Sequence, residues 1–424
     1  MAHLVGEVAI ETRGTTNEDL LVKFRLLELL KDPSTGRGFD VEIFETRIVE
    51  RNVKFAHSRC RDWCYKNNQH PDFVSPRECE RCFNNEIIDG ILTVKQSGDK
   101  FPIIGGVPRI LPKEILQDEM QRKYPDYLAK HRDKFNVQPG MAYSVEQKKK
   151  ATVDTFGYQW TTFTDNFDYF KYIFLSFTRP FLDEEDFKNK LVLEIGCGSG
   201  RPAVTACRLG AEVVGMDISQ AVDTAFQKSL EIPFLHVVQA DAYAPPFNQA
   251  FDIIYSVGVL QHISNPRRAL DGMFKVMSQR SPLVLWVYGK RELWYQPVEW
   301  LRSVTTRMPL QMLHGLSFLL ALWSEAFLLM PYRLLSRVPA CNRLADKIPG
   351  RIYARFPFKE NVVGWFDRLG APVTHYFNKQ EIMEMLSGAG FTDIKIAERR
   401  EASASWIVEA RRNDVKLTSS KAQL

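Results

Sequence analysis

Three absences narrow what this 424-residue chain can be. The N-terminus lacks the basic and then apolar start of a secretory signal, so we expect a cytoplasmic protein. Cysteines number only seven and three of them stand alone, which argues against a disulfide framework. Strong charge is lacking too. The 56 basic and 51 acidic residues leave a formal net charge of +5, which implies no polyelectrolyte partner for the chain as a whole.

Long apolar runs are also scarce, and a single run approaches the length of a membrane span. It covers residues 308–331, contains His314 and Glu325, and is bracketed by Pro309 and Pro331. A charged side chain is costly at the centre of a bilayer. We therefore predict a buried or interfacial helix here, with a transmembrane helix as the less favoured alternative.

From residue 181 onward, short apolar runs alternate with stretches of helical periodicity, which is typical of a parallel α/β sheet. Asn265 before Pro266, and Asn378 with Glu381, predict two helix starts. The expected strands are 191–195, 212–216, 234–239, 251–256, 283–288, 393–397 and 405–410. We predict one α/β domain over 181–412 and a solvated tail over 413–424.

A glycine-rich loop follows the first of these strands. It reads Glu194-Ile-Gly-Cys-Gly-Ser-Gly200, a helix is expected directly after it, and Asp217 ends the next strand. In an α/β sheet this order places a ligand beyond the strand ends, where glycines let the backbone approach closely. Asp217 is then sited to accept hydrogen bonds from ribose hydroxyls.

The glycine spacing separates two classes of cofactor. A dinucleotide-binding loop usually reads G-x-G-x-x-G and seats a pyrophosphate on the N-terminus of a helix. Here the pattern is E-x-G-x-G-x-G, and the carboxylate of Glu194 would repel phosphates. A ligand that carries a sulfonium and an ammonium group fits this loop better.

Further residues continue the pattern. Asp241-Ala242 follows the third strand, and Phe251-Asp-Ile-Ile-Tyr255 forms the fourth. With the loop and Asp217, they resemble class I S-adenosylmethionine-dependent methyltransferases. The resemblance implies a Rossmann-like domain with a seven-stranded mixed sheet. The residues expected to bind S-adenosylmethionine are Glu194, Gly196, Cys197, Gly198, Gly200, Asp217, Ile218, Asp241, Ala242 and Val257.

The same resemblance implies a role for each part of this set. The glycines should wrap the amino-acid part of the cofactor, and Asp217 should hold the ribose. Ile218 should pack on the adenine, and Asp241 should meet the adenine amino group with Ala242 beside it. Val257 should lie near the methionine moiety.

His262 follows the fourth strand, where many methyltransferases of this family place a histidine in the substrate pocket. An imidazole suits the role of general base near neutral pH, and a base is needed only if the acceptor is a hydroxyl or a similar weak acid. We name His262 as the candidate catalytic residue. A structural contact at a helix start is the alternative.

Tyr158 and Trp160 belong to an aromatic segment upstream of the loop. The segment is similar to the N-terminal lid that related methyltransferases fold over the cofactor. An aromatic ring against a sulfonium would gain about 0.5–2 kcal/mol. Ordinary packing of a helix on the sheet is the alternative.

Four cysteines are clustered as Cys60-x3-Cys64 and Cys79-x2-Cys82. Four thiolates in two short knuckles fit a closed, structural zinc site. We therefore predict zinc as a second ligand of the protein. The alternative is four reduced, unliganded thiols.

The cysteines fall in residues 50–85, inside a β-rich segment over 1–115. Leu26–Leu30, Gly90–Val94 and Phe101–Pro112 in this segment resemble the small zinc-ribbon protein that activates tRNA methyltransferases. That protein's own cysteine positions are occupied here by Asp32, Thr35, Lys95 and Gly98. The zinc prediction consequently rests on cysteine spacing, and the zinc-ribbon-like module is expected to act as a scaffold or partner surface.

Residues 116–180 are expected to form a helical lid or linker, and residues 290–373 an insertion after the fifth strand of the α/β domain. Between Lys290 and Arg368 there are 12 basic and 6 acidic residues, an excess of +6. Apolar helices with a basic excess suit an amphipathic or acidic acceptor, or contact with a membrane surface. A helical cap or a dimer interface is the alternative.

These observations predict a cytoplasmic methyltransferase, with peripheral contact to the inner face of the membrane as an alternative. We expect O- or C-methylation of a small or amphipathic acceptor of glycan, lipid-linked or natural-product type. An RNA methyltransferase and a non-catalytic scaffold are the alternatives. Nucleic acid is the less favoured partner, because no aromatic and basic stacking platform is evident. Nothing in the sequence bears on the oligomeric state.

Overall fold

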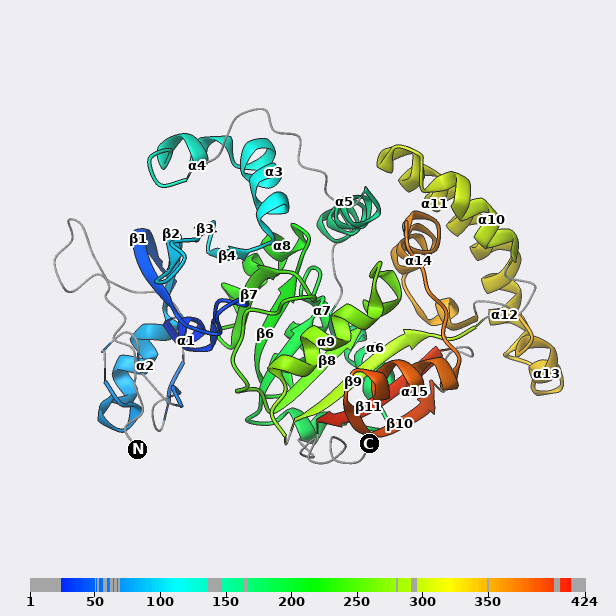
Figure 1. Cartoon of the computed structure of the whole chain (residues 1–424). Coiled ribbons are helices and arrows are strands. Elements are labelled where there is room, and N and C mark those ends of the chain that lie inside the picture. Colours follow the sequence, from blue (N-terminus) through cyan, green and yellow to red (C-terminus); the bar gives the residue numbers. More distant parts are fainter. Residues whose placement is uncertain are drawn as a thin grey trace, which may run out of the picture.

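The computed structural model describes residues 24–412, except 50, 52, 56–58, 62–63, 65–66, 68, 136–146, 163–166, 280, 291–295, 349–350 and 400–404. The tail predicted over 413–424 lies outside the described residues. One mixed sheet runs through the centre of the molecule (Figure 1). In the described part of the chain it has 11 strands in the order β1-β2-β3-β4-β7-β6-β5-β8-β9-β11-β10.

Seven of these strands form the predicted α/β core. The parallel strands are β5 (Leu191–Ile195), β6 (Glu212–Asp217), β7 (Leu235–Ala240), β8 (Ile253–Val257) and β9 (Pro282–Tyr288). At one edge β11 (Ser405–Arg412) and β10 (Phe391–Glu398) continue the sheet in antiparallel pairing. Each predicted strand lies within two residues of the observed one, because continuous apolar runs bounded by polar turns are a strong local signal.

Helices cover both faces of this core. Alternate residues of β5 point to opposite faces, so that Leu193 joins one apolar cluster and Val192 the other. The first cluster is covered by α1 (Phe24–Leu29), α9 (Pro266–Val276) and α15 (Lys379–Gly388), and the second by α6 (Phe167–Thr178), α7 (Arg201–Arg208) and α8 (Ala221–Ser229). Both predicted caps are confirmed: Asn265 accepts from the backbone N–H of Arg268, and Asn378 forms a capping box with Glu381.

The prediction of seven strands is too small, because N-terminal strands extend the same sheet. They are β1 (Phe39–Ile48), β2 (Asn85–Val94), β3 (Lys100–Ile104) and β4 (Val107–Ile110). The first three pairings are antiparallel, but β4 runs parallel to β7, with Ile110 opposite Ala240. An edge strand has backbone N–H and C=O groups that need partners. The sequence pattern shows where the strands lie, but it does not show which strand edges pair with one another.

A buried cluster of charges holds the N-terminal segment against the core. Arg25 on α1 is 1% exposed, and its Nε lies 2.9 Å from Oε1 of Glu212 at the start of β6. Glu212 also pairs with Arg59 at 3.1 Å and His236 at 3.2 Å. Burial by itself would raise the pKa of Glu212, but the charges of Arg25, His236 and Arg59 hold it well below its usual range. Glu212 is therefore ionised in the folded protein.

The predicted four-cysteine zinc site is not assembled. Among the described residues, no group of three or more His, Cys, Asp or Glu side chains is arranged to hold a metal ion. Cys60, Cys64 and Cys79 share a small apolar cluster, whereas Cys82, on α2 (Pro76–Phe83), packs into the main core. Close spacing along the chain does not decide which way each thiol points. The likeness of residues 1–115 to a zinc-ribbon activator stays a prediction.

Further helices lie above the ends of the core strands. They are α3 (Lys113–Lys123), α4 (Pro125–Lys130) and α5 (Gln147–Thr162), and Figure 1 shows α5 between α8 and α14. Short helical turns in the described part of the chain are η1 (Pro71–Phe73), η2 (Glu184–Phe187), η3 (Leu260–His262), η6 (Pro339–Cys341) and η7 (Arg351–Arg355).

The segment after β9 forms α10 (Gln296–Thr305), α11 (Leu310–Ser324), the π-helical η5 (Glu325–Leu329), α12 (Met330–Leu335), α13 (Asn342–Ala345) and α14 (Phe358–Gly370). The helix that contains the apolar run extends past Pro331 to Leu335. Proline removes a backbone N–H inside a helix, and the π-helical turn directly before it accommodates this loss. By length and composition, 310–335 is long and apolar enough to cross a membrane.

The charge cluster at Glu212 predicts a stability test. We expect Glu212→Gln to lower the free energy of unfolding by about 3–5 kcal/mol, because it leaves buried Arg25 with less compensating charge. Glu185→Gln is the matched control, since this exposed residue pairs only with Lys188 at the surface. Urea unfolding followed by circular dichroism measures both. Equal stabilities of the two variants would contradict a role for Glu212 in attaching the N-terminal segment.

Candidate active site

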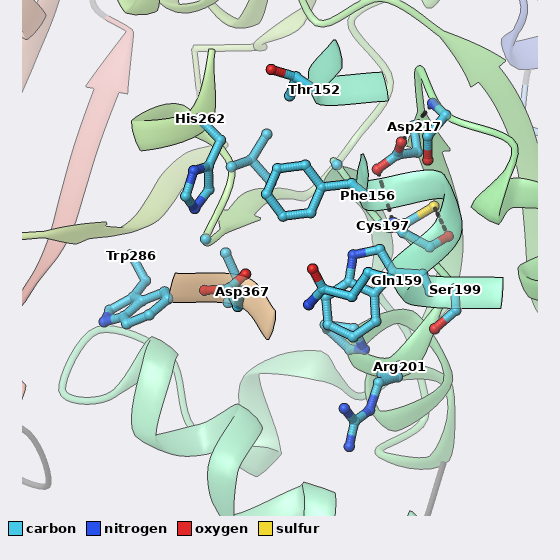
Figure 2. A pocket seen from close by; sticks show the side chains of 18 of the residues that line it. Thr152, Phe156, Gln159, Cys197, Ser199, Arg201, Asp217, His262, Trp286 and Asp367 are labelled. Atoms are coloured by element: carbon cyan, nitrogen blue, oxygen red, sulfur yellow. Dashed lines mark hydrogen bonds between the residues drawn. The ribbon is translucent and has the colours of Figure 1, made fainter. Parts of the chain in front are cut away.

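A cavity of about 350 Å³ opens at the C-terminal ends of the core strands (Figure 2). All parallel strands end at the same edge of a sheet, so the loops after β5, β6, β7 and β8 meet there. Side chains from α5, α6 and α14 complete the wall. The cavity thus lies between the sheet, the helix α5 and the insertion after β9.

The cavity brings together ten of the residues predicted from the sequence. They are Trp160, Gly196, Cys197, Gly198, Asp217, Ile218, Asp241, Ala242, Val257 and His262. Three others lie outside its wall, namely Tyr158, Glu194 and Gly200. Tyr158 stacks on Phe366 of α14 with ring centroids 5.7 Å apart, as in the packing alternative.

The glycine-rich loop is tight at every glycine. Gly196, Gly198 and Gly200 have φ angles of +82°, +52° and +81°, in the left-handed region that side chains rarely adopt. A Cβ at Gly196 would lie 2.2 Å from a methyl carbon of Val259. The N–H groups of Gly196 and Cys197 both donate to the carbonyl of Met216, so the loop folds back across the end of β6.

Glu194 lies behind this loop and not in the cavity. It is 1% exposed and accepts a hydrogen bond from the hydroxyl of Tyr255 at 3.1 Å. Burial raises the pKa of Glu194 well above its usual value, against the hydrogen bond from Tyr255 and with support from the nearby charge of Asp217. Glu194 is therefore not placed for direct contact between its carboxyl group and a ligand in the cavity.

Two carboxylates face the cavity at the ends of β6 and β7. Asp217 accepts backbone N–H bonds from Gly198 at 2.9 Å and Ser219 at 2.8 Å, one on each oxygen. Each carboxylate oxygen has a second lone pair, which leaves capacity for a ligand. Asp241 pairs at 2.5 Å with Lys149 from α5, so this helix covers the end of β7.

Gln159 on α5 is a wall residue that the sequence interpretation missed. It is 1% exposed, and neither its amide nitrogen nor its amide oxygen has a hydrogen-bond partner in the described structure. Figure 2 shows it beside the loop residues Cys197 and Ser199. An unsatisfied buried polar group costs about 1–3 kcal/mol, and a ligand bound beside Gln159 would supply the missing partners. The available signal was its position three residues after Phe156, which places both residues on the same face of a helix.

His262 faces the same cavity from η3. Its Nδ1 lies 2.9 Å from the carbonyl oxygen of Val373. A carbonyl only accepts, so the neutral ring carries its proton on Nδ1 and keeps the Nε2 lone pair. Burial lowers the pKa of His262, against the charge of Asp367 and the bond to Val373. The ring also lies 5.0 Å from that of Phe156 and 5.5 Å from that of Tyr288.

The rest of the wall includes aromatic side chains beside charged ones such as Arg201, Glu360, Asp367 and Arg399. The aromatic members are Phe156, Phe170, Phe177, Tyr243, Trp286, Tyr288, Tyr353 and Phe356. The indole nitrogen of Trp286 is buried without a hydrogen-bond partner among the described residues. In Figure 2, Trp286 and Asp367 lie across the cavity from Asp217 and Cys197. An ion pair of 2.8 Å between Arg201 of α7 and Glu360 of α14 joins the loop side to the insertion.

Residues 193–285 match the family model described as a methyltransferase domain. This segment begins in β5, ends in β9, and includes the glycine-rich loop, Asp217, Asp241 and His262. The strand order of the core agrees with the mixed sheet expected from the resemblance. The chain carries a class I methyltransferase domain.

Curated relatives match part of this methyltransferase domain. The ubiquinone biosynthesis O-methyltransferase of Roseobacter denitrificans is 37% identical over 95 residues, which are 21% of this chain and 38% of that protein. The protein of the same name from Bartonella quintana is 30% identical over 132 residues, 29% of this chain and 50% of that protein. The chain thus spans half or less of the length of these relatives.

Among solved structures, human N-acetylserotonin methyltransferase in complex with S-adenosylmethionine shares 14% identity, with 70% of both chains covered and a TM-score of 0.37. Magnesium protoporphyrin IX methyltransferase from Synechocystis shares 16% identity over 71% of this chain and 100% of that one, with a TM-score of 0.33.

The unsatisfied amide of Gln159 predicts two effects of opposite sign. We expect Gln159→Leu to stabilise the ligand-free protein by about 1 kcal/mol and to weaken S-adenosylmethionine binding by about tenfold. Urea unfolding and titration calorimetry measure the two effects. Gln227→Leu, a change at an exposed position of α8, is the control and should alter neither. A loss of stability with unchanged affinity would show that the amide serves the fold.

Proposed function

We propose that this chain transfers the methyl group of S-adenosylmethionine to a hydroxyl oxygen of an amphipathic, aromatic acceptor. The observation that carries the proposal is His262, a buried neutral imidazole with its Nε2 lone pair available at the aromatic half of the cavity. The names of the partial relatives, which are O-methyltransferases, support oxygen over carbon as the acceptor atom. We assign the half of the wall beside the glycine-rich loop to the cofactor and the opposite, aromatic half to the acceptor.

The loop half fits the cofactor. The backbone of Gly196 and Gly198 would hold its amino-acid part, and the amide of Gln159 would meet the polar groups there. The lone pairs left on Asp217 suit ribose hydroxyls. Asp241, held by Lys149, would accept from the adenine amino group. When bound, S-adenosylmethionine supplies a methyl group made electrophilic by its sulfonium.

Ile218 and Ala242 line the cavity beside these polar groups and would flank the adenine ring. Val257, at the end of β8, would lie near the methionine moiety, and Cys197 would contribute backbone within the loop. Trp160 contacts the loop at Gly198, where a Cβ would come within 3.1 Å of the indole. This arrangement lets α5 act as a lid that keeps water from the cofactor.

The other half of the wall fits an apolar acceptor. Phe177, Trp286 and Phe356 line this half, and aromatic groups prefer offset or edge-on contact with such rings. The guanidinium of Arg399 lies over the ring of Phe177 at 4.3 Å from its centroid and 5.6 Å from that of Trp286. The free indole N–H of Trp286 would donate a hydrogen bond to an oxygen substituent on the aromatic ring of the acceptor. An acceptor with an aromatic head and an apolar tail would bury both against this wall.

His262 would act as the general base. Its Nε2 takes the hydroxyl proton while the acceptor oxygen forms its bond to the methyl carbon and the carbon–sulfur bond breaks. One proton thus moves to the imidazole, and the sulfonium charge is lost with the methyl group. A fixed Nδ1–H bond to Val373 keeps the ring oriented for this transfer. Alignment of the acceptor oxygen with the methyl carbon and the sulfur would increase the rate further.

The acceptor class is tested with labelled S-adenosylmethionine and two phenols, dodecyl gallate and gallic acid. We expect kcat/KM for dodecyl gallate to be at least about tenfold higher, because the alkyl chain is removed from water. Thin-layer separation of the labelled ethers measures the rates. Cofactor binding with no label in either phenol would contradict the aromatic acceptor. Absence of cofactor binding by calorimetry would contradict methyl transfer itself.

The role of His262 predicts a pH signature. Burial lowers the pKa of His262, so the base stays neutral at a pH below the usual histidine pKa of about 6.5. The wild-type kcat should therefore stay constant as the pH falls past that value, and then decrease as the ring protonates. His262→Gln should lower kcat by about 10²–10⁴-fold and remove this acid limb, with cofactor affinity unchanged. The control is His70→Gln, which alters an exposed histidine of the N-terminal segment. Retention of the acid limb in His262→Gln would assign the titration to another group.

A further inference from the structure

The insertion after β9 exposes large apolar side chains at high density. Of the sixteen such side chains that are exposed among the described residues, twelve lie between Trp300 and Leu344. Six of them recur at helical spacing along α11, η5 and α12. They are Met312, Leu319, Trp323, Phe327, Met330 and Leu334, which we call the outer stripe. Their exposed fractions run from 48% to 66%, so the stripe faces solvent along its whole length.

The opposite face of the same helix is attached to α14. Leu313 and Ala321 are buried there, together with the small residues Ser317 and Ser324. The amide nitrogen of Asn361 donates to the carbonyl of Ala321 at 3.2 Å and to the hydroxyl of Ser324 at 2.8 Å. A helix that is apolar on all sides is typical of a protein interior or of contact with lipid. Here one side is inside the protein, and the outer stripe is left for a partner.

Charge indicates which partner suits the stripe. Residues 296–360 contain nine Lys or Arg and four Asp or Glu, an excess that equals the +5 of the whole chain. Arg307 precedes the stripe, and Arg337, Arg343 and Lys347 follow it, all of them exposed. Apolar side chains with tryptophan, flanked by basic residues, match the interface of an anionic bilayer, where rings enter the acyl boundary and cations meet lipid phosphates.

The attachment to α14 argues for a helix lying on the membrane. The segment is long enough to span a bilayer, but spanning would surround it with lipid and break the polar contacts of Asn361. Glu325 and Arg333 also form an ion pair on the helix itself. A helix with one protein-bound face and one apolar face fits the plane of the interface.

We propose that the outer stripe and its flanking basic residues bind the surface of an anionic bilayer. The same insertion supplies Tyr353, Phe356 and Val363 to the cavity, so docking brings the acceptor end of the cavity close to the lipid. Figure 1 shows α10 to α13 at the outer edge of the molecule, with α14 between them and the sheet. Delivery of a lipid-soluble acceptor rests on the proposed function, whereas the docking does not.

Co-sedimentation with vesicles tests the docking. The full chain should bind vesicles of equal parts phosphatidylglycerol and phosphatidylcholine, bind phosphatidylcholine alone weakly, and lose affinity in high salt. A double change, Trp323→Ser with Phe327→Ser, should lower the partition coefficient at least about tenfold. Arg337→Glu with Arg343→Glu should weaken binding about tenfold, and only to the anionic vesicles. Phe73→Ser, at a 76% exposed position outside the insertion, is the matched control.

Further measurements separate the possibilities. Calorimetric binding of S-adenosylmethionine by each variant shows that its fold is intact, and the salt dependence of the wild-type chain tests the proposal without any variant. A dimer in sedimentation velocity that the Trp323 and Phe327 changes dissolve, without vesicle binding, would overturn the proposal in favour of a second copy. Vesicle binding without methylation of dodecyl gallate would support the docking and contradict the proposed acceptor.

Discussion

Three left-handed glycines after β5 are the constraint on which the rest of the site depends. Each one lets a different part of the molecule approach: Val259 at Gly196, Trp160 at Gly198, and Ala225 of α8 at Gly200, where a Cβ would come within 3.0 Å. A side chain at any of these positions would strain the backbone and push a neighbour away. The loop is therefore a packing junction as well as a binding surface, and it brings the lid helix α5 to the mouth of the cavity.

Buried ion pairs attach the two outer segments to the core of the domain. Arg25 and Glu212 join the N-terminal segment to β6, and Arg201 and Glu360 join α7 to the insertion. Burying charge costs free energy unless the partner is in place, so each pair favours one docked arrangement over partly docked ones. The first attachment carries the sheet extension through β4, and none of the described wall residues of the cavity comes from the N-terminal segment. The second attachment brings the aromatic wall opposite the glycine loop.

The two halves of the cavity differ in origin and in chemistry. Strand ends and the glycine loop build the polar half, which fits a ligand with ribose hydroxyls and charged ends. The insertion and α6 add ring faces to the other half, including Phe177 and Tyr353. His262, which we propose as the general base, lines the same cavity, and burial lowers its pKa. The polar half lies within the segment that matches the methyltransferase domain, whereas the insertion that lines the other half also exposes the outer stripe.

The sequence by itself determined the seven core strands, the two helix caps and the strand-end residues of the cavity, because apolar periodicity and glycine sterics act over a few neighbouring residues. It did not reveal that β4 extends the sheet beyond β7, that Glu194 lies behind the loop, or that Cys82 turns away from the other three cysteines of the predicted zinc site. It also missed Gln159 in the wall. Those outcomes depend on which surfaces meet between segments that are separated in the sequence. Only the tertiary structure decides them, because packing and buried charge select one arrangement among many that the local pattern allows.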